Sequence, residues 1–313
     1  MFPYLLKIGS FELRVYSLML ILAVVTGIFF SSRRAKQLGI EPKIVENAVI
    51  AVFAGGIIGA RLYYVAFNWA YYGTHPGEIL AVWHGGLAIH GGIIAGILAA
   101  LIYCHNKKLT AVKFGDILAP FILIGQGFGR FGNFANGEAH GVPTLTPPDV
   151  IFRLKPAFNE FWGATLKTAE LKNTPEGVSQ LADKLPMTVD LAGKSLELKE
   201  YVPWGISFPV RSSQAYMEFG TLAVHPTFFY EMILNFFCAF ILLLFWRKDK
   251  NIGSGKIFAL YLFMYAIIRS FVTFFRADDL MLGPLRAPHV ASLVLVVAAI
   301  FYYFWTKRLG SAK

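Results

Sequence analysis

Residues 222–246 read LAVHPTFFYEMILNFFCAFILLLFW, a run whose only ionisable acid or base besides His225 is Glu231. A helix needs about 20 mainly apolar residues to cross the hydrocarbon core of a bilayer, so this run predicts a membrane-spanning helix. Six other stretches have the same character. We therefore expect seven spans, at residues 15–32, 44–67, 86–104, 114–132, 222–246, 256–275 and 288–305.

The composition of the 313-residue chain supports the same class of protein. Charged residues make up only 15% of it, against 56% hydrophobic and 16% aromatic residues. These values exclude a disordered chain or a coiled coil, and they argue against a soluble enzyme, whose surface needs more polar side chains. A net charge of +10 would suggest nucleic acid in a soluble domain. In a membrane protein it indicates basic cytoplasmic loops, so we expect no nucleic-acid partner.

The distribution of basic residues predicts the orientation of this all-α polytopic membrane protein. Fourteen Lys and Arg residues fall in the loops near 33–43, 107–113, 247–256 and 307–313, and only four fall in the short loops of the opposite side. By the positive-inside rule, the N-terminus lies outside and the C-terminus is cytoplasmic.

The polar segment 139–221 lies between the fourth and fifth spans. Unstructured loops of this length are uncommon, so we expect a small external subdomain, with a partly disordered insertion as the alternative. The predicted organisation is therefore spans one to four in 1–138, the subdomain in 139–221 and spans five to seven in 222–313. The two cysteines, Cys104 and Cys238, lie in or beside apolar runs, so we expect neither a disulfide nor a metal site.

Several ionisable residues fall inside the predicted spans, where charge is costly and usually functional. Two of them, Glu46 and Asp116, lie near cytoplasmic helix ends, and we favour simple solvation there. The others need a partner or a function. They are Arg61, His90, Arg130, Glu231 and Arg269.

The third span is expected to begin within the sequence WHGGLAIHGGIIAG. On one helix, His84 and His90 would lie about 120° apart, which argues against a metal site formed by two histidines. A histidine several residues inside a span needs a partner or a role, and we favour His90 as a proton acceptor. The glycine pairs indicate either tight helix packing or close approach of a ligand, and both readings stay open.

The fourth span ends in GRFGNFANGEAHG. If the helix continues, Arg130, Asn133 and Asn136 share one face and offer several N–H donors to an anion, with Glu138 at the boundary. The alternative is an interfacial arginine followed by helix-capping residues.

The sixth span places Tyr265, Arg269, Thr273 and Arg276 on one stripe. The two arginines are too few for a voltage sensor, and beside Arg130 they predict a site for a lipid phosphate. Glu231, one turn into the fifth span, is a candidate counter-ion for any of the three arginines.

Five motifs make the chain similar to the bacterial prolipoprotein diacylglyceryl transferases. They are RVYS at 14–17, HGG at 90–92, GRFGNFANGE at 129–138 followed by Gly141, HPTFFYE at 225–231 and YAIIRSFVTFFR at 265–276. The resemblance covers nearly all of the chain except about 142–215. It implies transfer of diacylglycerol from phosphatidylglycerol to the lipobox cysteine of a prolipoprotein, forming a thioether and releasing glycerol-1-phosphate.

The resemblance also implies the site residues and the setting. The predicted catalytic residues are His90 as base, Arg130 and Arg269 as partners of the phosphate, and Glu138 to orient an arginine. The expected substrate-binding positions are Tyr16, Arg61, Asn133, Asn136, Gly141, Glu231, Tyr265 and Arg276. We expect no cofactor and no metal. The expected location is the bacterial cytoplasmic (inner) membrane, with the site open towards the periplasmic side and with the bilayer, phosphatidylglycerol and the lipobox signal peptide as partners.

The chain departs from the family pattern at four points. Thr273 replaces an acid, Phe228 replaces a glutamine, Ala135 replaces a larger apolar residue, and the external segment is long. Two alternatives follow. One is a non-catalytic relative that binds lipid or lipoprotein, which would hold its ligand without turnover. The other is a transporter of an anionic lipid or solute, which would move its substrate unchanged.

Overall fold

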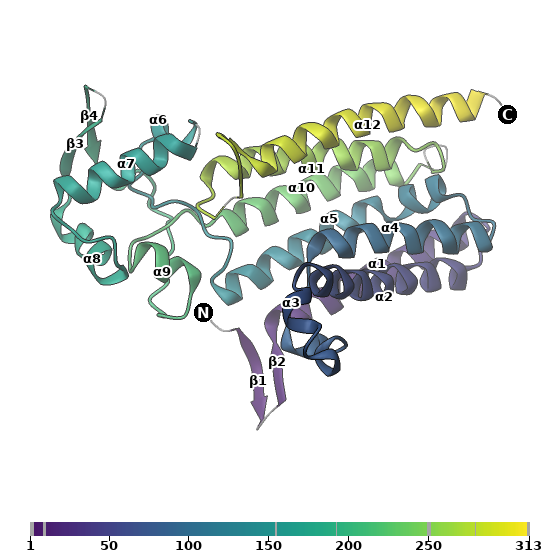
Figure 1. Cartoon of the computed structure of the whole chain (residues 1–313). Coiled ribbons are helices and arrows are strands. Elements are labelled where there is room, and N and C mark those ends of the chain that lie inside the picture. The colour runs from purple at the N-terminus through teal and green to yellow at the C-terminus, as the bar shows by residue number, and fades with distance from the viewer. Residues whose placement is uncertain are drawn as a thin grey trace. The chain divides into compact units, whose positions relative to one another are not determined.

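The computed structural model describes residues 3–8, 11–153, 155–191, 193–248, 252–278 and 280–311, and it is mainly helical (Figure 1). Seven of its helices are long and apolar enough to cross a membrane, which confirms the predicted all-α polytopic class. They are α1 (Val15–Gln37), α2 (Pro42–Phe67), α4 (Ile89–Asn106), α5 (Ala111–Asn136), α10 (Thr227–Trp246), α11 (Lys256–Phe275) and α12 (Ala287–Ser311).

Two of the helices start later than predicted. Helix α4 begins at Ile89 rather than 86, because Gly85 and Gly86 have positive φ values of 86° and 70° and cannot continue a right-handed helix. Helix α10 begins at Thr227 rather than 222, directly after Pro226. A proline disfavours helical geometry in the residue before it, here His225.

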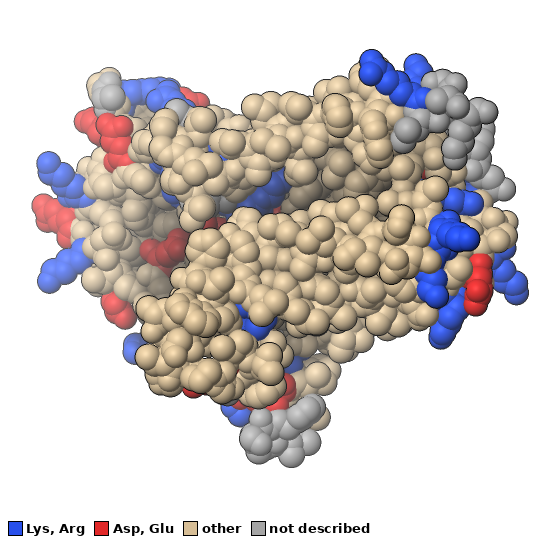
Figure 2. Space-filling view, turned by 45° about the vertical axis from the view of Figure 1, so that its right-hand side comes forward, with Lys and Arg blue, Asp and Glu red and all other residues tan. Residues whose placement is uncertain are grey.

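The remaining elements are short. Strands β1 (Tyr4–Ile8) and β2 (Phe11–Arg14) form an antiparallel hairpin before α1, and β5 (Met281–Leu282) pairs with β6 (Leu285–Arg286) before α12. The connection from α2 to α4 contains α3 (Trp69–Tyr72), η1 (Pro76–Glu78) and η2 (Val82–His84). In Figure 2, residues other than Lys, Arg, Asp and Glu cover most of the visible surface, and most of the visible Lys and Arg lie towards its left and right edges.

Two compact units divide the chain. Unit 1 comprises Met1–Ala23, Leu123–Ile241 and Leu260–Phe301, and unit 2 comprises Val24–Ile122, Leu242–Ala259 and Tyr302–Lys313. Helices α1, α5, α10, α11 and α12 each contribute residues to both units. The units are described separately below.

In unit 1, the segment 139–221 folds around its own apolar core. It contains α6 (Pro148–Ile151), α7 (Lys155–Thr168), α8 (Pro175–Ser179), η3 (Gln180–Lys184), the hairpin of β3 (Met187–Leu191) and β4 (Lys194–Leu198), and α9 (Gln214–Phe219). Phe161, Leu181 and Leu198 are fully buried in this core. Phe228 at the start of α10 packs into the same cluster, so the segment is joined to the first turn of a spanning helix.

In unit 2, glycines bring α2 and α4 into close contact. A Cβ atom added at Gly91 would lie 2.3 Å from the carbonyl oxygen of Gly59, and one at Gly55 would lie 2.9 Å from Cβ of Ala99. Small residues allow helix backbones in a membrane to approach in this way. For Gly91, the structure therefore favours the packing interpretation of the HGG motif.

Asp116, also in unit 2, is not solvated, contrary to our expectation. Its carboxylate is fully buried and accepts the backbone N–H groups of Gly253, Gly255 and Phe258, at 2.8–3.0 Å. It therefore satisfies free donors at the N-terminus of α11, where the helix dipole also favours a negative charge. Glu46, for which we expected solvation at a helix end, is partly exposed, and its carboxylate lies 3.5 Å from Nζ of Lys43.

Candidate active site

A buried ion-pair cluster joins three spanning helices in unit 1. Arg130 of α5 donates from Nη2 to Oε1 of Glu231 on α10 at 2.8 Å, and Arg269 of α11 donates from Nη1 to Oε2 of the same carboxylate at 3.3 Å. The Glu231 side chain is 1% exposed, whereas those of Arg130 and Arg269 are 21% and 17% exposed. One acid thus holds two cations whose outer edges remain accessible.

The end of α5 adds a chain of polar contacts to Arg130. Its Nη1 donates to Oδ1 of Asn133 at 3.0 Å, and Nδ2 of Asn133 lies 3.5 Å from Oε2 of Glu138. Nδ2 of Asn136 lies 3.4 Å from the other Glu138 oxygen. The predicted shared face of α5 is present in the structure. Glu138 reaches the arginine through Asn133, while the carboxylate that contacts Arg130 directly is that of Glu231.

Local backbone geometry explains the position of Glu138. Helix α5 ends at Asn136, and Gly137 adopts a positive φ of 68°, which ends the helix as C-terminal glycines commonly do. The N–H of Glu138 then donates to the carbonyl of Asn133 at 3.0 Å. The chain turns back over the last helical turn, so the exposed carboxylate faces the two asparagines.

Two tyrosines border the cluster. A Cβ atom at Gly132 would lie 2.5 Å from Cδ2 of Tyr16, so this glycine lets α1 pack directly against α5, and Tyr16 lies close enough to Arg130 to interact with its charge. Tyr265 of α11 lies close enough to Glu231, Arg130 and Arg269 to interact with their charges. The structure therefore brings the predicted residues Tyr16 and Tyr265 together with the arginine cluster.

Gly141 has a structural role at the end of α11. Its N–H donates to the carbonyl of His225 at 2.9 Å, and Val142 donates to the carbonyl of Phe275 at 2.8 Å. A Cβ atom at Gly141 would lie 2.6 Å from the His225 oxygen and 2.7 Å from that of Phe275. Only glycine fits between these two backbone segments, at His225 and at Phe275.

The predicted cation stripe of the sixth span ends earlier than expected. Helix α11 stops at Phe275, and Arg276 lies just beyond it, with Nη2 at 2.8 Å from Asp278. Arg286, one of the four basic residues in the short loops of the predicted outer side, is buried and donates to the carbonyls of Thr273, Phe274 and Arg276. It caps the C-terminus of α11. No periodic signal marks such a cap, because donor and acceptors come from different elements.

His90 and Arg61 belong to unit 2. His90 is the second residue of α4 and is exposed, with its ring centroid 6.2 Å from that of Tyr63. The expectation that it lies several residues inside the third span is wrong, because the helix starts only at Ile89. An assignment as base therefore cannot rest on burial. The role of His90 as a base stays a prediction.

Arg61 is buried, and its guanidinium binds the connection between α2 and α4. It donates to the carbonyls of Glu78, Ile79, Gly85 and Gly86 at 2.6–3.1 Å. A Cβ atom at Gly86 would lie 2.6 Å from Nη1 of Arg61. The guanidinium thus holds residues 78–86, the loop that precedes His90 in the sequence, through four hydrogen bonds. A direct role for Arg61 in lipid binding remains a prediction.

Two departures from the family pattern have a structural explanation. The hydroxyl of Thr273 donates to the carbonyl of Arg269 at 2.6 Å, inside α11. Arg269 pairs with the carboxylate of Glu231 and therefore has an acidic partner even though position 273 is not an acid. Phe228 is buried against Phe134, Phe208 and Phe229, with ring centroids 4.8–6.0 Å apart. It completes the core of the 139–221 segment.

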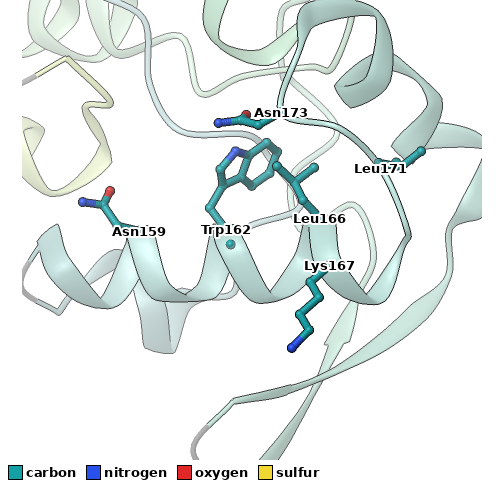
Figure 3. Close-up of a pocket in the computed structure, with 7 residues that line it drawn as sticks. Asn159, Trp162, Leu166, Lys167, Leu171 and Asn173 are labelled. Atoms are coloured by element: carbon teal, nitrogen blue, oxygen red, sulfur yellow. The ribbon is translucent and has the colours of Figure 1, made fainter.

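A separate pocket of about 490 Å³ lies on α7 and is lined by Asn159, Trp162, Gly163, Leu166, Lys167, Leu171 and Asn173 (Figure 3). The indole of Trp162 points towards Asn173, while Lys167 points to the other side of the helix. None of the predicted site residues lines it. Within the described residues, no cluster of three or more His, Cys, Asp or Glu side chains could hold a metal ion.

Seven apolar helices of spanning length define a multi-pass membrane protein, and in unit 1 three of them join a buried carboxylate to two arginines. The family model described as prolipoprotein diacylglyceryl transferase matches residues 3–305, and the chain belongs to this family. It is therefore a transferase, as the sequence motifs implied.

Three relatives illustrate the similarity, and each is named phosphatidylglycerol–prolipoprotein diacylglyceryl transferase. That of Fusobacterium nucleatum is 42% identical over 302 residues, 96% of each chain. That of Streptococcus pyogenes serotype M5 is 32% identical over 96% of this chain and 93% of its own length. That of Synechococcus elongatus is 30% identical over 97% of this chain and 86% of its own.

Proposed function

We propose that this chain transfers the diacylglyceryl group of phosphatidylglycerol to the lipobox cysteine of prolipoproteins, the first step of lipoprotein maturation. The observation that carries this proposal is the pair of arginines on the buried carboxylate of Glu231. The names of the relatives support both substrates. The excess of basic residues in one set of loops supports a site that opens on the outer face of the bacterial cytoplasmic membrane.

The reaction is a displacement at the glycerol carbon next to the phosphate. The cysteine sulfur attacks as thiolate, because a free thiol has a pKa of about 8.5 and its neutral form is a weak nucleophile. The new bond is C–S, and the bond that breaks is C–O between the glycerol carbon and the phosphate. The products are a thioether and glycerol-1-phosphate, which leaves with the electrons of the broken bond.

The charge of the cluster suits this chemistry. Arg130, Arg269 and Glu231 together carry a formal charge of +1, which complements the single negative charge of the phosphodiester. As the C–O bond breaks, a second negative charge develops on the phosphate. Two planar guanidinium groups held in place before the reaction stabilise that charge, an effect worth several kcal/mol in a site that excludes water.

The other predicted residues have supporting roles in this proposal. His90 accepts the proton of the thiol. Its exposed position at the start of α4 leaves its ring accessible to a substrate. Asn133, Asn136 and Glu138 form the polar chain that orients Arg130 and the head group. Tyr16 and Tyr265 border the phosphate. Arg61 and Gly141 hold backbone segments of unit 2 and unit 1, respectively, and Arg276 forms an ion pair with Asp278.

The test is a transfer assay with detergent-purified protein, phosphatidylglycerol vesicles and a lipobox peptide with one cysteine. Mass spectrometry should detect a diacylglyceryl adduct on that cysteine. Arg130→Ala should abolish the adduct, and His90→Gln should slow its formation strongly. Arg33→Ala is the matched control, because Arg33 is exposed and stacks on Phe29. A full yield of adduct from Arg130→Ala would overturn the phosphate site, and full turnover by His90→Gln would remove the base assignment.

A further inference from the structure

The turn that follows α5 in unit 1 carries Glu138 in an unusual backbone conformation. Ala139 has a positive φ of 55°, in the left-handed region that residues with a side chain adopt only when their surroundings hold them there. Gly137, on the other side of Glu138, has a φ of 68°. The carboxylate of Glu138 therefore faces Asn133 and Asn136 because two successive left-handed turns of the chain direct it there.

Thr227, the first residue of α10, holds this turn. Its hydroxyl donates to the carbonyl of Ala139 at 2.6 Å, and the two residues are only 1% and 5% exposed. A peptide group is planar, so a hydrogen bond at this carbonyl fixes the orientation of the whole peptide that follows Ala139. Because the site is buried, solvent water does not replace the hydroxyl as a donor.

The same face of α10 makes a second contact with the polar chain of α5. Thr227 and Glu231 are four residues apart, so they lie one turn apart on one side of the helix. Glu231 holds Arg130, and Thr227 holds the residue that follows Glu138. Between these two contacts, polar side chains connect Arg130 to Glu138 through Asn133. Helix α10 thus fixes both ends of this chain of contacts.

The residues after Ala139 are anchored by other elements. His140 is fully buried, with Nε2 at 3.2 Å from Oε2 of Glu218 on α9, and its carbonyl accepts the N–H of Ala277 at 3.4 Å. These contacts hold the chain as it enters the 139–221 segment. The hydrogen bond to Ala139 itself comes from Thr227.

We propose that Thr227 is a positioning residue of the transferase. Its hydroxyl holds the turn at Ala139, and this turn keeps the carboxylate of Glu138 against the asparagines that orient Arg130. The inference rests on the proposed function and deepens it, because it adds a residue that acts on the phosphate site without touching the substrate. The hydroxyl is the essential group, since a methyl group of the same size donates no hydrogen bond to the carbonyl.

The experiment measures the binding of phosphatidylglycerol to the full chain in detergent by native mass spectrometry, which requires no turnover. Thr227→Val has the shape of threonine without the hydroxyl, and it should weaken binding about fivefold, the equivalent of about one net hydrogen bond. Thr227→Ser keeps the hydroxyl and should bind nearly as tightly as the wild type. Thr165→Val is the matched control, because Thr165 is also fully buried and donates to a backbone carbonyl, that of Phe161. It should leave binding unchanged.

A double variant tests whether Thr227 acts through Glu138. In Glu138→Ala there is no carboxylate to position, so the addition of Thr227→Val should weaken binding by less than about twofold. A full fivefold loss in that background would overturn the proposed route. Thr227→Ala also lacks the hydroxyl, and it replaces Thr227→Val in every comparison if the valine variant does not fold.

Hydrogen exchange distinguishes a local effect from a general loss of stability. Thr227→Val should speed amide exchange in residues 134–142 and leave the exchange of α7, in the same unit, unchanged. Faster exchange in both regions would mean that the hydroxyl only stabilises the fold, and would overturn the positioning role.

The outcomes separate this inference from the proposed function. If Arg130→Ala binds phosphatidylglycerol as tightly as the wild type, the phosphate site itself fails. If binding depends on Arg130 but Thr227→Val binds like the wild type, only the positioning role of Thr227 is overturned. The same conclusion follows if Thr227→Ser loses as much affinity as Thr227→Val.

Discussion

The carboxylate of Glu231 lies 2.8 Å from the guanidinium of Arg130, a contact that joins residues 101 positions apart in the chain. The same carboxylate accepts a hydrogen bond from Arg269. A buried acid between two arginines keeps both cations in place before an anion arrives. It also lowers the cost of keeping two like charges close together in a membrane.

The first prediction concerns Glu231. Glu231→Gln keeps the shape of the side chain but removes the charge, so the two arginines repel each other and lose their fixed positions. Removing one partner of a buried ion pair typically costs about 3–5 kcal/mol. We expect a clear fall in Tm and at least a tenfold loss of transfer rate, measured by thermal unfolding in detergent and by the adduct assay.

The control for Glu231 is Asp149→Asn, which breaks the exposed pair of Asp149 and Lys194. Exposed pairs contribute little to stability, so this variant should keep the wild-type Tm and rate. Wild-type stability and rate in Glu231→Gln would show that the arginines do not depend on this carboxylate.

The second prediction tests the packing of α2 against α4. Gly91→Ala places a methyl group 2.3 Å from the Gly59 carbonyl and 2.2 Å from Cβ of Tyr63, so the helices must separate. Overpacking of this kind typically costs about 1–3 kcal/mol. We expect a lower Tm for this variant, measured by thermal unfolding.

The matched control for Gly91 is Gly129→Ala. Gly129 also lies within a helix, but among the described residues no heavy atom outside its chain neighbours and its own helix backbone lies within 4 Å of an added Cβ. Alanine is the better helix former by up to about 1 kcal/mol, so this variant should be as stable as the wild type or slightly more so. Equal effects at both positions would contradict the packing explanation of the HGG motif.

The third prediction concerns the loop held by Arg61. Arg61→Lys keeps the charge, but a single ammonium group cannot reach four carbonyls spread over residues 78–86. We expect faster cleavage within residues 73–88 in limited proteolysis. Arg33→Lys at an exposed position should leave the cleavage pattern unchanged. A wild-type pattern in Arg61→Lys would mean that the loop is held by other contacts.

The fourth prediction is a dependence of stability on pH. Burial lowers the pKa of His225 from 6.5 to about 4 in the folded protein. Between these values the unfolded chain binds more protons at this residue, so stability falls as the pH is lowered from about 6.5 to about 4. The full effect of His225 is about 3 kcal/mol, from 1.36 kcal/mol per pKa unit.

The test compares the wild type with His225→Phe by thermal unfolding at pH 7.5, 6 and 4.5. The loss of Tm at low pH should be smaller in the variant, because carboxylate titrations are common to both proteins. Parallel pH profiles would show that the pKa of His225 does not change on folding. Its hydrogen bond to Tyr230, at 3.1 Å, is lost at every pH and so shifts the whole profile of the variant.

Features that depend on one segment alone were accessible from sequence. Arg130 and Asn133 lie three residues apart, so helical periodicity places them on one face, and the structure has their contact at 3.0 Å. From sequence, Glu231 was predicted only as a counter-ion for one of three arginines, and which arginine it pairs with could not be predicted. The positions of His90 and Asp116 were misjudged. In the first case the helix began later than hydropathy suggested, and in the second the acid found three backbone donors in another segment.

The sequence by itself determined the seven apolar helices and the family motifs. Both follow from local properties, because a bilayer selects the length and hydropathy of each segment independently of the others. Only the tertiary structure decided that Glu231 pairs with Arg130 and Arg269, and that Arg286 and Asp116 cap the two ends of α11. The reason is physical. Pairings between helices depend on which faces meet and at what level, and a single helical period carries no information about its neighbours.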